Sequence, residues 1–373
     1  MSDTATAGLS RLIDAVLEAE ASERDRARVE TTRTPRLNVE IEDPIAWTAL
    51  FGYEAERYFT DPAFYFEQFL RQKLWRFEHF EDDVPITLEV PAWLGHYPEY
   101  TFLGMDVRVT PKGVPIIQRD HPMSQSPDLG LLAPVDFGSS GWMPRALRWY
   151  DDLLRLADGR LTVTFMTWNR GCLDLAVQLR GYENLVLDFV ERPDFVHGLV
   201  GFLADQRNRW YTARGEYLGE PIEATWMADD WVGVPYVSPG AFADFVLPAY
   251  LAIERHHGVI GGFHSCGNQT PMQCHLLKLR SLETFEVSPW TDVAQSVANV
   301  PPSKHLHLFV HPNDVVVDSP ERMEEKLRAR AEHLRGRRFS LGTSGLTPLT
   351  DDSRAFVDRV KRWLGLAREV FAE

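Results

Sequence analysis

Short β-type runs alternate with helical stretches from about residue 84 onward, and this alternation constrains the fold more than any other feature. Seven short runs have the composition of β-strands: residues 86–90, 161–167, 224–228, 259–264, 284–287, 306–310 and 339–341. Between them, Ser238-Pro239 and Ser319-Pro320 each offer a capping hydroxyl followed by a proline in the first helical turn. Strands separated by helices indicate right-handed βαβ units and a parallel sheet.

An eighth parallel strand would close this sheet into a (β/α)8 TIM barrel, and we expect it in the less regular region 100–150. Amphipathic helices are predicted over 8–20, 62–78 and 352–371. We therefore expect residues 1–80 to form a helical extension that packs on the barrel, and residues 81–373 to form the catalytic barrel. An open doubly wound sheet is the alternative, although no GxGxxG motif follows an early strand.

Composition narrows the class of partner. Lysine and arginine total 39 against 54 acidic residues, a net charge of −15, which disfavours binding to nucleic acid or to an anionic membrane. No apolar run approaches the roughly 18–20 residues of a membrane span, and the first residues lack the pattern of a signal peptide. Three cysteines cannot build a disulfide framework in 373 residues. We expect a cytoplasmic protein that acts on a small molecule, with a homodimer as an open option.

Polar and metal-competent residues follow the β-type runs. In a barrel, these positions converge on one mouth, and this convergence is the argument for an active site there. The residues that we single out are Trp168, Asn169, Asp229, Asp230, His264, Cys266, Asn268, Glu286, His311 and Ser344.

The triplet His264-Ser265-Cys266 is the most specific element. Residues two apart in an extended segment point the same way, so the imidazole and the thiolate can reach one ion. Such N and S ligands suit Zn²⁺, which keeps an open position in catalytic sites. The alternative is a hydrogen-bonded core histidine beside a small buried thiol. Cys274, eight residues beyond Cys266, is a further candidate ligand or else helix packing.

The other candidates have two interpretations each. Asp229 and Asp230 point apart as sequence neighbours, so one can face the mouth as a catalytic carboxylate while the other caps a loop or helix. His311 is a candidate base or ligand, or an imidazole tied to the backbone. A third group consists of predicted substrate-binding residues, some of which could instead belong to the core: Trp168, Asn169, Asn268 and Glu286.

The chain resembles the uroporphyrinogen decarboxylase superfamily, which includes that decarboxylase and zinc-dependent, cobalamin-linked methyltransferases. The resemblance covers roughly residues 80–370 and implies a (β/α)8 barrel with its site at the C-terminal mouth. It rests on the order of these segments: Arg180-Gly181-Tyr182-Glu183, residues 190–194, Asp229-Asp230-Trp231, Val237-Ser238-Pro239, residues 245–248, His264-Ser265-Cys266-Gly267-Asn268 and Gly345-Leu346-Thr347-Pro348.

The methyltransferase branch is the closer one, because the arginine-rich N-terminal segment of the decarboxylase is missing here. The resemblance implies that His264 and Cys266 bind zinc together with a distant cysteine. The position of that cysteine aligns with Ser344, so this chain departs from the pattern. Residues that could complete the metal shell are Cys274, His311, Glu286, Ser344 or one carboxylate of the pair 229–230. A His, Cys and carboxylate set also admits iron.

Three functions follow as hypotheses. The first is a metal-dependent methyltransferase that moves a methyl group between a corrinoid or small methylated donor and an acceptor, with zinc and cobalamin as expected cofactors. The second is a metal-free decarboxylase or lyase acting on a small carboxylic acid. The third is a non-catalytic barrel that binds a corrinoid or a corrinoid protein. No corrinoid-binding Asp-x-His-x-x-Gly motif occurs in the chain, so cobalamin would come from a partner or as a free ligand.

Overall fold

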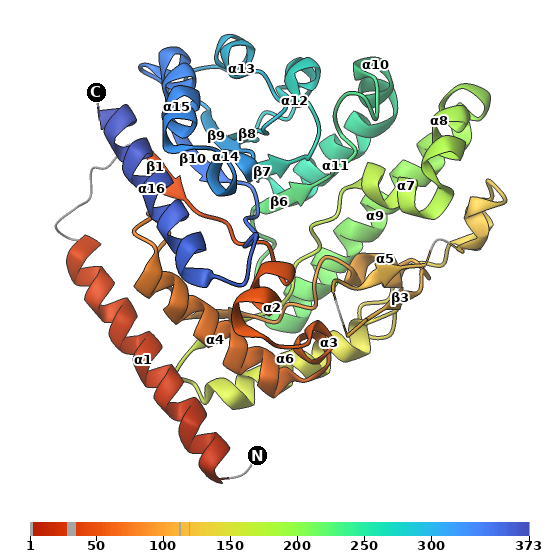
Figure 1. Ribbon diagram of the computed structural model, residues 1–373. Helices are drawn as coiled ribbons and strands as arrows, with labels where there is room; N and C mark the ends of the chain where they lie inside the picture. Colours follow the sequence, from red (N-terminus) through yellow and green to blue (C-terminus); the bar gives the residue numbers. More distant parts are fainter. Residues whose placement is uncertain (1–2, 28–34, 112, 119, 373) are drawn as a thin grey trace.

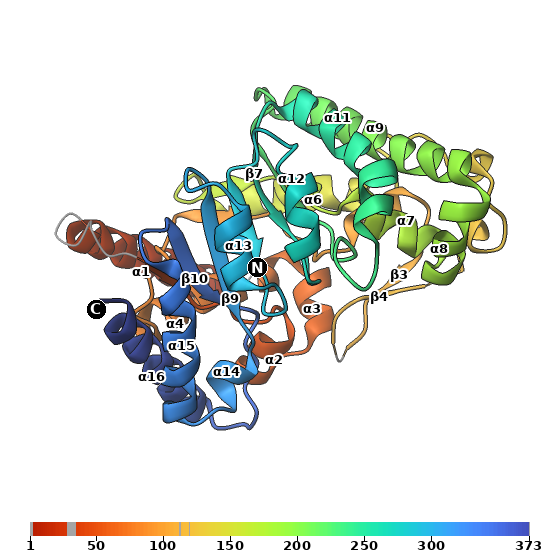
Figure 2. The ribbon, with the colours of Figure 1, turned by 90° about the horizontal axis from the view of Figure 1, so that it is seen from above.

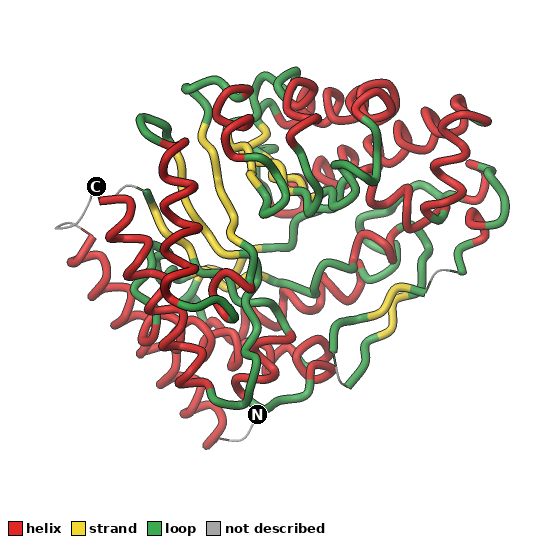
Figure 3. Tube along the Cα trace, turned by 45° about the horizontal axis from the view of Figure 1, so that its top comes forward, coloured by secondary structure: helices red, strands yellow, loops and turns green. Residues whose placement is uncertain are grey.

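The computed structural model describes residues 3–27, 35–111, 113–118 and 120–372 as a mixed α/β fold (Figure 1). The strands of the main sheet lie on the inside, with helices around them (Figure 3). Six parallel strands form one sheet in the order β1-β10-β9-β8-β7-β6. Their bounds are β1 Arg36–Asn38, β6 Thr225–Ala228, β7 Ile260–His264, β8 Thr284–Val287, β9 His305–Val310 and β10 Phe339–Thr343.

Two smaller strand pairs complete the described strands. β2 (Glu89–Pro91) and β5 (Thr162–Thr164) pair in parallel. A single parallel bridge between Arg170 and Ala228 links the segment after β5 to β6. The other pair, β3 (Val107–Arg108) and β4 (Ile116–Ile117), is antiparallel. Because the strands of the large sheet are parallel, the residues that follow them gather at one edge.

Helices occupy most of the remaining chain. Figure 1 shows α1 beside α4, and Figure 2 shows α9 and α11 side by side. The helix bounds are α1 Asp3–Ala27, α2 Ile45–Phe51, α3 Ala55–Thr60, α4 Pro62–His79, α5 Pro98–Phe102, α6 Met143–Ala157, α7 Cys172–Arg180, α8 Tyr182–Glu191, α9 Pro193–Leu218, α10 Pro239–Ala241, α11 Leu247–His257, α12 Gln273–Leu276, α13 Val293–Asn299, α14 Asn313–Val316, α15 Pro320–Leu334 and α16 Ser353–Ala372.

The helix signals of the sequence act as expected. Ser238 Oγ accepts from the Ala241 N–H at 3.1 Å, and Ser319 Oγ accepts from the Arg322 N–H at 3.3 Å. The helix that begins after Ser238 is interrupted by a π-helical turn, Phe242–Val246, directly before α11. Pro248 lies at the start of α11 and has no N–H to continue an α-helical ladder, which accounts for the irregularity there.

The strand predictions are accurate where a strand is buried. The run 284–287 coincides with β8, and the six other runs overlap β2, β5, β6, β7, β9 and β10. The region 100–150 does not supply the expected eighth parallel strand, because its described residues form only the antiparallel pair β3-β4. Instead, β1 pairs in parallel with β10, inside the segment 1–80 that was expected to be helical. Residues 28–34 of that segment lie outside the described residues.

The core lies between the sheet and the helices. On β9, Leu306, Leu308 and Val310 are buried and alternate with less buried His305, His307 and Phe309. The helix predicted over 352–371 is amphipathic as expected, because α16 buries Phe356, Val360, Trp363, Ala367 and Val370. Among the described residues, no helix combines the length and apolar character needed to cross a bilayer.

Candidate functional site

Three different donor side chains meet where β6 and β7 end. His264 is the last residue of β7, Cys266 follows it by two residues, and Asp230 lies two residues beyond β6. Asp230 Oδ1 is 3.4 Å from His264 Nε2 and 3.3 Å from Cys266 Sγ, and Cys266 Sγ is 3.5 Å from His264 Nε2. In the part of the chain that the structure describes, this is the one group of three such residues whose ligand atoms all lie within 4.8 Å of one another.

The alternation of extended backbone places His264 and Cys266 on the same side. The residue between them, Ser265, is fully buried on the other side, where its Oγ donates to the Val232 carbonyl at 2.6 Å. The site is accessible, because the side chains of His264 and Asp230 keep 35% and 34% of their exposure and Cys266 is exposed. An ion or a small molecule can therefore reach all three donors.

Glu286 fixes the orientation of the His264 ring. It lies on β8, the strand beside β7, and its Oε2 is 2.5 Å from His264 Nδ1. Glu286 is buried to 4% exposure, so its carboxylate is not free to face a substrate as the sequence analysis expected. A carboxylate behind a histidine holds the Nδ1 proton and leaves Nε2 directed at Asp230 and Cys266.

The electrostatics of the group follow from this packing. Burial by itself lowers the pKa of His264, but its hydrogen bonds with Asp230, Cys266 and Glu286 outweigh burial and raise the pKa well above its ordinary value. Burial would raise the pKa of Asp230, yet the His264 hydrogen bond and the charge of Arg170 hold it far below its usual range. Burial raises the pKa of the Cys266 thiol.

Asp229 has a structural position, as the capping alternative for this pair expected. Its side chain is fully buried and accepts from the N–H groups of Leu173 and Asp174 at 2.9 and 3.0 Å, in the first turn of α7. The Tyr250 hydroxyl also donates to it. Gly171 makes the approach possible, since a Cβ there would lie 2.2 Å from Asp229 Oδ2. Burial and the charge of Asp174 raise the pKa of Asp229 to about 8.

Arg170 is a member of the site that the sequence analysis did not select. Its Nη1 donates to Asp230 Oδ2 at 2.7 Å and to Asp174 Oδ2 at 2.9 Å. The residue follows a strand, like the selected ones, and that position was the available signal. Asp174 lies only four residues along the chain, but Asp230 lies 60 residues away, and no local pattern indicates that Arg170 meets it.

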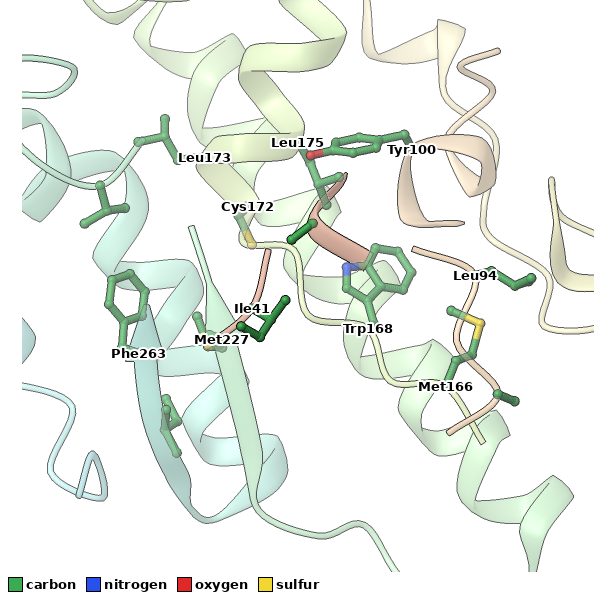
Figure 4. Packing of buried hydrophobic residues seen from close by; sticks show 14 of the residues in the cluster. Ile41, Leu94, Tyr100, Met166, Trp168, Cys172, Leu173, Leu175, Met227 and Phe263 are labelled. Atoms are coloured by element: carbon green, nitrogen blue, oxygen red, sulfur yellow. The ribbon is translucent and has the colours of Figure 1, made fainter. Parts of the chain in front are cut away.

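Two residues near Arg170, Trp168 and Asn169, were predicted to bind substrate. Trp168 is fully buried and packs against Phe102 and Trp210, with ring centroids 5.6 and 6.1 Å away. Figure 4 shows it within the buried hydrophobic cluster. The side chain of Asn169 accepts from the Thr167 hydroxyl at 3.1 Å. Trp168 is therefore a core residue.

The remaining candidates make local contacts. Asn268 Oδ1 accepts from the Thr270 N–H at 3.0 Å, and His311 Nδ1 accepts from the Asn313 N–H at 3.1 Å. Cys274 is exposed, with its Sγ 3.9 Å from the Pro271 carbonyl, and it does not belong to the group of three donors. Ser344 follows β10, where its N–H donates to the Val310 carbonyl at 3.1 Å.

The fold and the site define a parallel α/β protein with a His, Cys and Asp group at its strand ends. No protein-family profile matches the chain, and no curated protein matches it in sequence. Among solved structures, it is similar to a methyltransferase from Methanosarcina mazei, with a TM-score of 0.65 and 16% sequence identity over 93% of this chain and 97% of that chain. At this identity the similarity establishes a shared fold.

Proposed function

We propose that the protein is a metal-dependent methyltransferase and that His264, Cys266 and Asp230 hold its metal ion. The observation that carries the proposal is the convergence of three chemically different donors within 4.8 Å at accessible strand ends. The donor set fits the group, because imidazole, thiolate and carboxylate are the usual protein ligands of Zn²⁺. Glu286 behind His264 adds the second-shell carboxylate typical of such sites.

In this proposal, Asp230 takes the place of the third cysteine ligand that the superfamily pattern has and this chain lacks. The zinc-dependent methyltransferases that the sequence resembles have a third cysteine where this chain has Ser344. Here the third donor comes from β6, which is adjacent to β7 in the sheet. A carboxylate donates less charge than a thiolate, so the ion would be the stronger Lewis acid.

A closed (β/α)8 barrel around the site is part of the same proposal. Eight strands run in chain order as β1, β2, β5, β6, β7, β8, β9 and β10, and all the pairs among them are parallel. β1 pairs with β10, the last strand. The Arg170–Ala228 bridge joins the segment after β5 to β6. Between β1 and the segment before β2, the Asp83 N–H donates to the Leu37 carbonyl at 2.8 Å. We propose that these contacts close a (β/α)8 barrel of the uroporphyrinogen decarboxylase superfamily.

The chain's own residues prepare the acceptor. Bound Zn²⁺ lowers the pKa of a thiol or water and thereby supplies a nucleophile at neutral pH. Glu286 keeps the His264 proton on Nδ1, so that the lone pair of Nε2 would be available to a metal ion. Asp230 Oδ1 and Cys266 Sγ face the same space as His264 Nε2. An acceptor that binds among these three atoms would therefore lie at the open strand ends. The methyl donor in this proposal is a corrinoid, carried by a partner or free, or a small methylated compound.

Metal analysis combined with a transfer assay tests the proposal. Purified protein should contain close to one zinc per chain, and the double variant His264→Ala/Cys266→Ala should contain none. The zinc-loaded protein should demethylate methylcobalamin in the presence of a thiol, and the double variant should not. Cys274→Ala is the matched control, because this thiol is exposed and lies outside the group of three. Metal-free protein that releases CO₂ from a carboxylic acid would contradict the proposal and favour a lyase.

A further inference from the structure

The two oxygens of the Asp230 carboxylate have different partners. Oδ1 lies 3.4 Å from His264 Nε2 and 3.3 Å from Cys266 Sγ, whereas Oδ2 accepts a hydrogen bond from Arg170 Nη1 at 2.7 Å. A carboxylate on a single rotatable side chain could turn either oxygen, or both, toward its neighbours. The contact with Arg170 selects Oδ1 as the oxygen that faces the other two donors.

Arg170 is itself held in place from several directions. Its Nη1 also donates to Asp174 Oδ2 at 2.9 Å, and its Nε donates to the His96 carbonyl at 3.3 Å. The guanidinium lies over the Tyr100 ring, 5.7 Å from the centroid, and the Tyr100 hydroxyl donates to Asp174 at 3.1 Å. Only 16% of the Arg170 side chain is exposed. Its planar head is therefore fixed before any ligand binds.

The backbone brings Arg170 and Asp230 together. Residue 170 forms a parallel bridge with Ala228, the last residue of β6, and the Gly171 N–H donates to the Ala228 carbonyl at 2.7 Å. Asp230 follows Ala228 by two residues, in the turn after β6. The pairing of the two segments thus brings Arg170 and Asp230 close together along the backbone, and the guanidinium reaches the carboxylate from there.

We propose that Arg170 is the positioning residue of the metal centre: by holding Oδ2 of Asp230, it presents Oδ1 as the single carboxylate donor beside His264 and Cys266. This inference rests on the proposed metal site. Arg170 does not contact the ion in this role. It reduces the freedom of a ligand, and loss of such an outer partner typically weakens metal affinity about 10–100-fold.

Cobalt binding tests the proposal, since the visible absorption bands of protein-bound Co²⁺ report ligand geometry. Arg170→Met should weaken Co²⁺ binding about 10–100-fold, measured by chelator competition, and should change the shape of the visible bands. Arg170→Lys keeps a positive charge without the planar guanidinium. Its Co²⁺ affinity should lie between that of the wild type and that of Arg170→Met. The matched control is Arg214→Met, because the Arg214 side chain is also 16% exposed and is paired with Glu220 away from the site. Its affinity and spectrum should equal those of the wild type.

A double-mutant cycle shows whether Arg170 acts through Asp230. In an Asp230→Ala background, Arg170→Met should cause no further loss of affinity. If Arg170→Met leaves Asp174 as an unpaired buried charge and the protein does not fold, Arg170→Met/Asp174→Asn removes that charge and is measured instead. The inference about Arg170 would be overturned if the Arg170 variants kept the affinity and spectrum of the wild type. It would also be overturned if Arg170→Met caused the same loss of affinity in the Asp230→Ala background as in the wild type; neither result would affect the proposed metal site. Wild-type protein that binds no Co²⁺ would overturn the proposed metal site as well.

Discussion

The contact between Glu286 and His264 predicts that the substitution Glu286→Gln weakens metal binding at the proposed site. Glu286→Gln replaces the charged acceptor of the Nδ1 proton with a neutral amide of the same shape. The two atoms are 2.5 Å apart and Glu286 is 4% exposed, so water cannot easily replace the lost charge. A hydrogen bond to a charged group contributes roughly 1.5–3 kcal/mol, about 1 kcal/mol more than a neutral one.

The expected loss in metal affinity follows from these values. A difference of about 1–1.5 kcal/mol corresponds to roughly a 5- to 13-fold weaker site. Zinc affinity is measured by competition with a chromophoric chelator at fixed pH. Glu283→Gln is the matched control, because it is the same exchange at an exposed position of the segment that leads into β8. Equal affinities for the wild type and Glu286→Gln, at unchanged stability, would refute the argument that Glu286 tunes His264.

Three further predictions concern Asp43, Trp168 and the two exposed cysteines. Burial and the charge of Glu42 raise the pKa of Asp43 to about 7, so its contribution to stability is present at low pH and is lost as pH rises from about 4 through 7. Asp43→Asn should therefore gain on the order of 1–3 kcal/mol over the wild type at pH 8 and little at pH 4, measured by urea unfolding; an equal difference at both pH values would contradict this. Trp168→Ala should cost roughly 3–5 kcal/mol without changing metal affinity, because the indole is fully buried, whereas 58%-exposed Trp290 should tolerate alanine; a loss of affinity with unchanged stability would place Trp168 at the site after all. Cys274→Ser should leave metal content unchanged and Cys266→Ser should reduce it, as elemental analysis would show.

The strands β7, β8 and β9 were predictable because apolar residues typical of strands cluster in short runs there. The covering helices bury the apolar members of these runs, among them Phe263, Phe285 and Leu308. β1 was not predictable, because it has three residues, and only Leu37 among them is a buried apolar side chain. Its pairing with β10 joins residues about 300 positions apart, and nothing in the local sequence specifies such a contact.

The candidate site was predictable in part for a similar reason. The spacing of His264 and Cys266 is local, and the period of an extended chain is sufficient to put both on one side. The choice between Asp229 and Asp230 depends on α7, whose first N–H groups take up Asp229 and leave Asp230 at the open strand end. Arg170 and Trp168 depend on packing between distant segments, so their positions required the structure.

X-ray absorption at the zinc edge of the purified, zinc-loaded protein tests the central claim most directly. The proposed centre predicts one sulfur neighbour at about 2.3 Å and two or three nitrogen or oxygen neighbours at about 2.0–2.2 Å, from Cys266, His264 and Asp230. The sulfur signal should disappear in Cys266→Ser and remain in Cys274→Ser. A shell of nitrogen and oxygen alone in the wild type, or a sulfur signal that survives the loss of Cys266, would contradict the proposed centre.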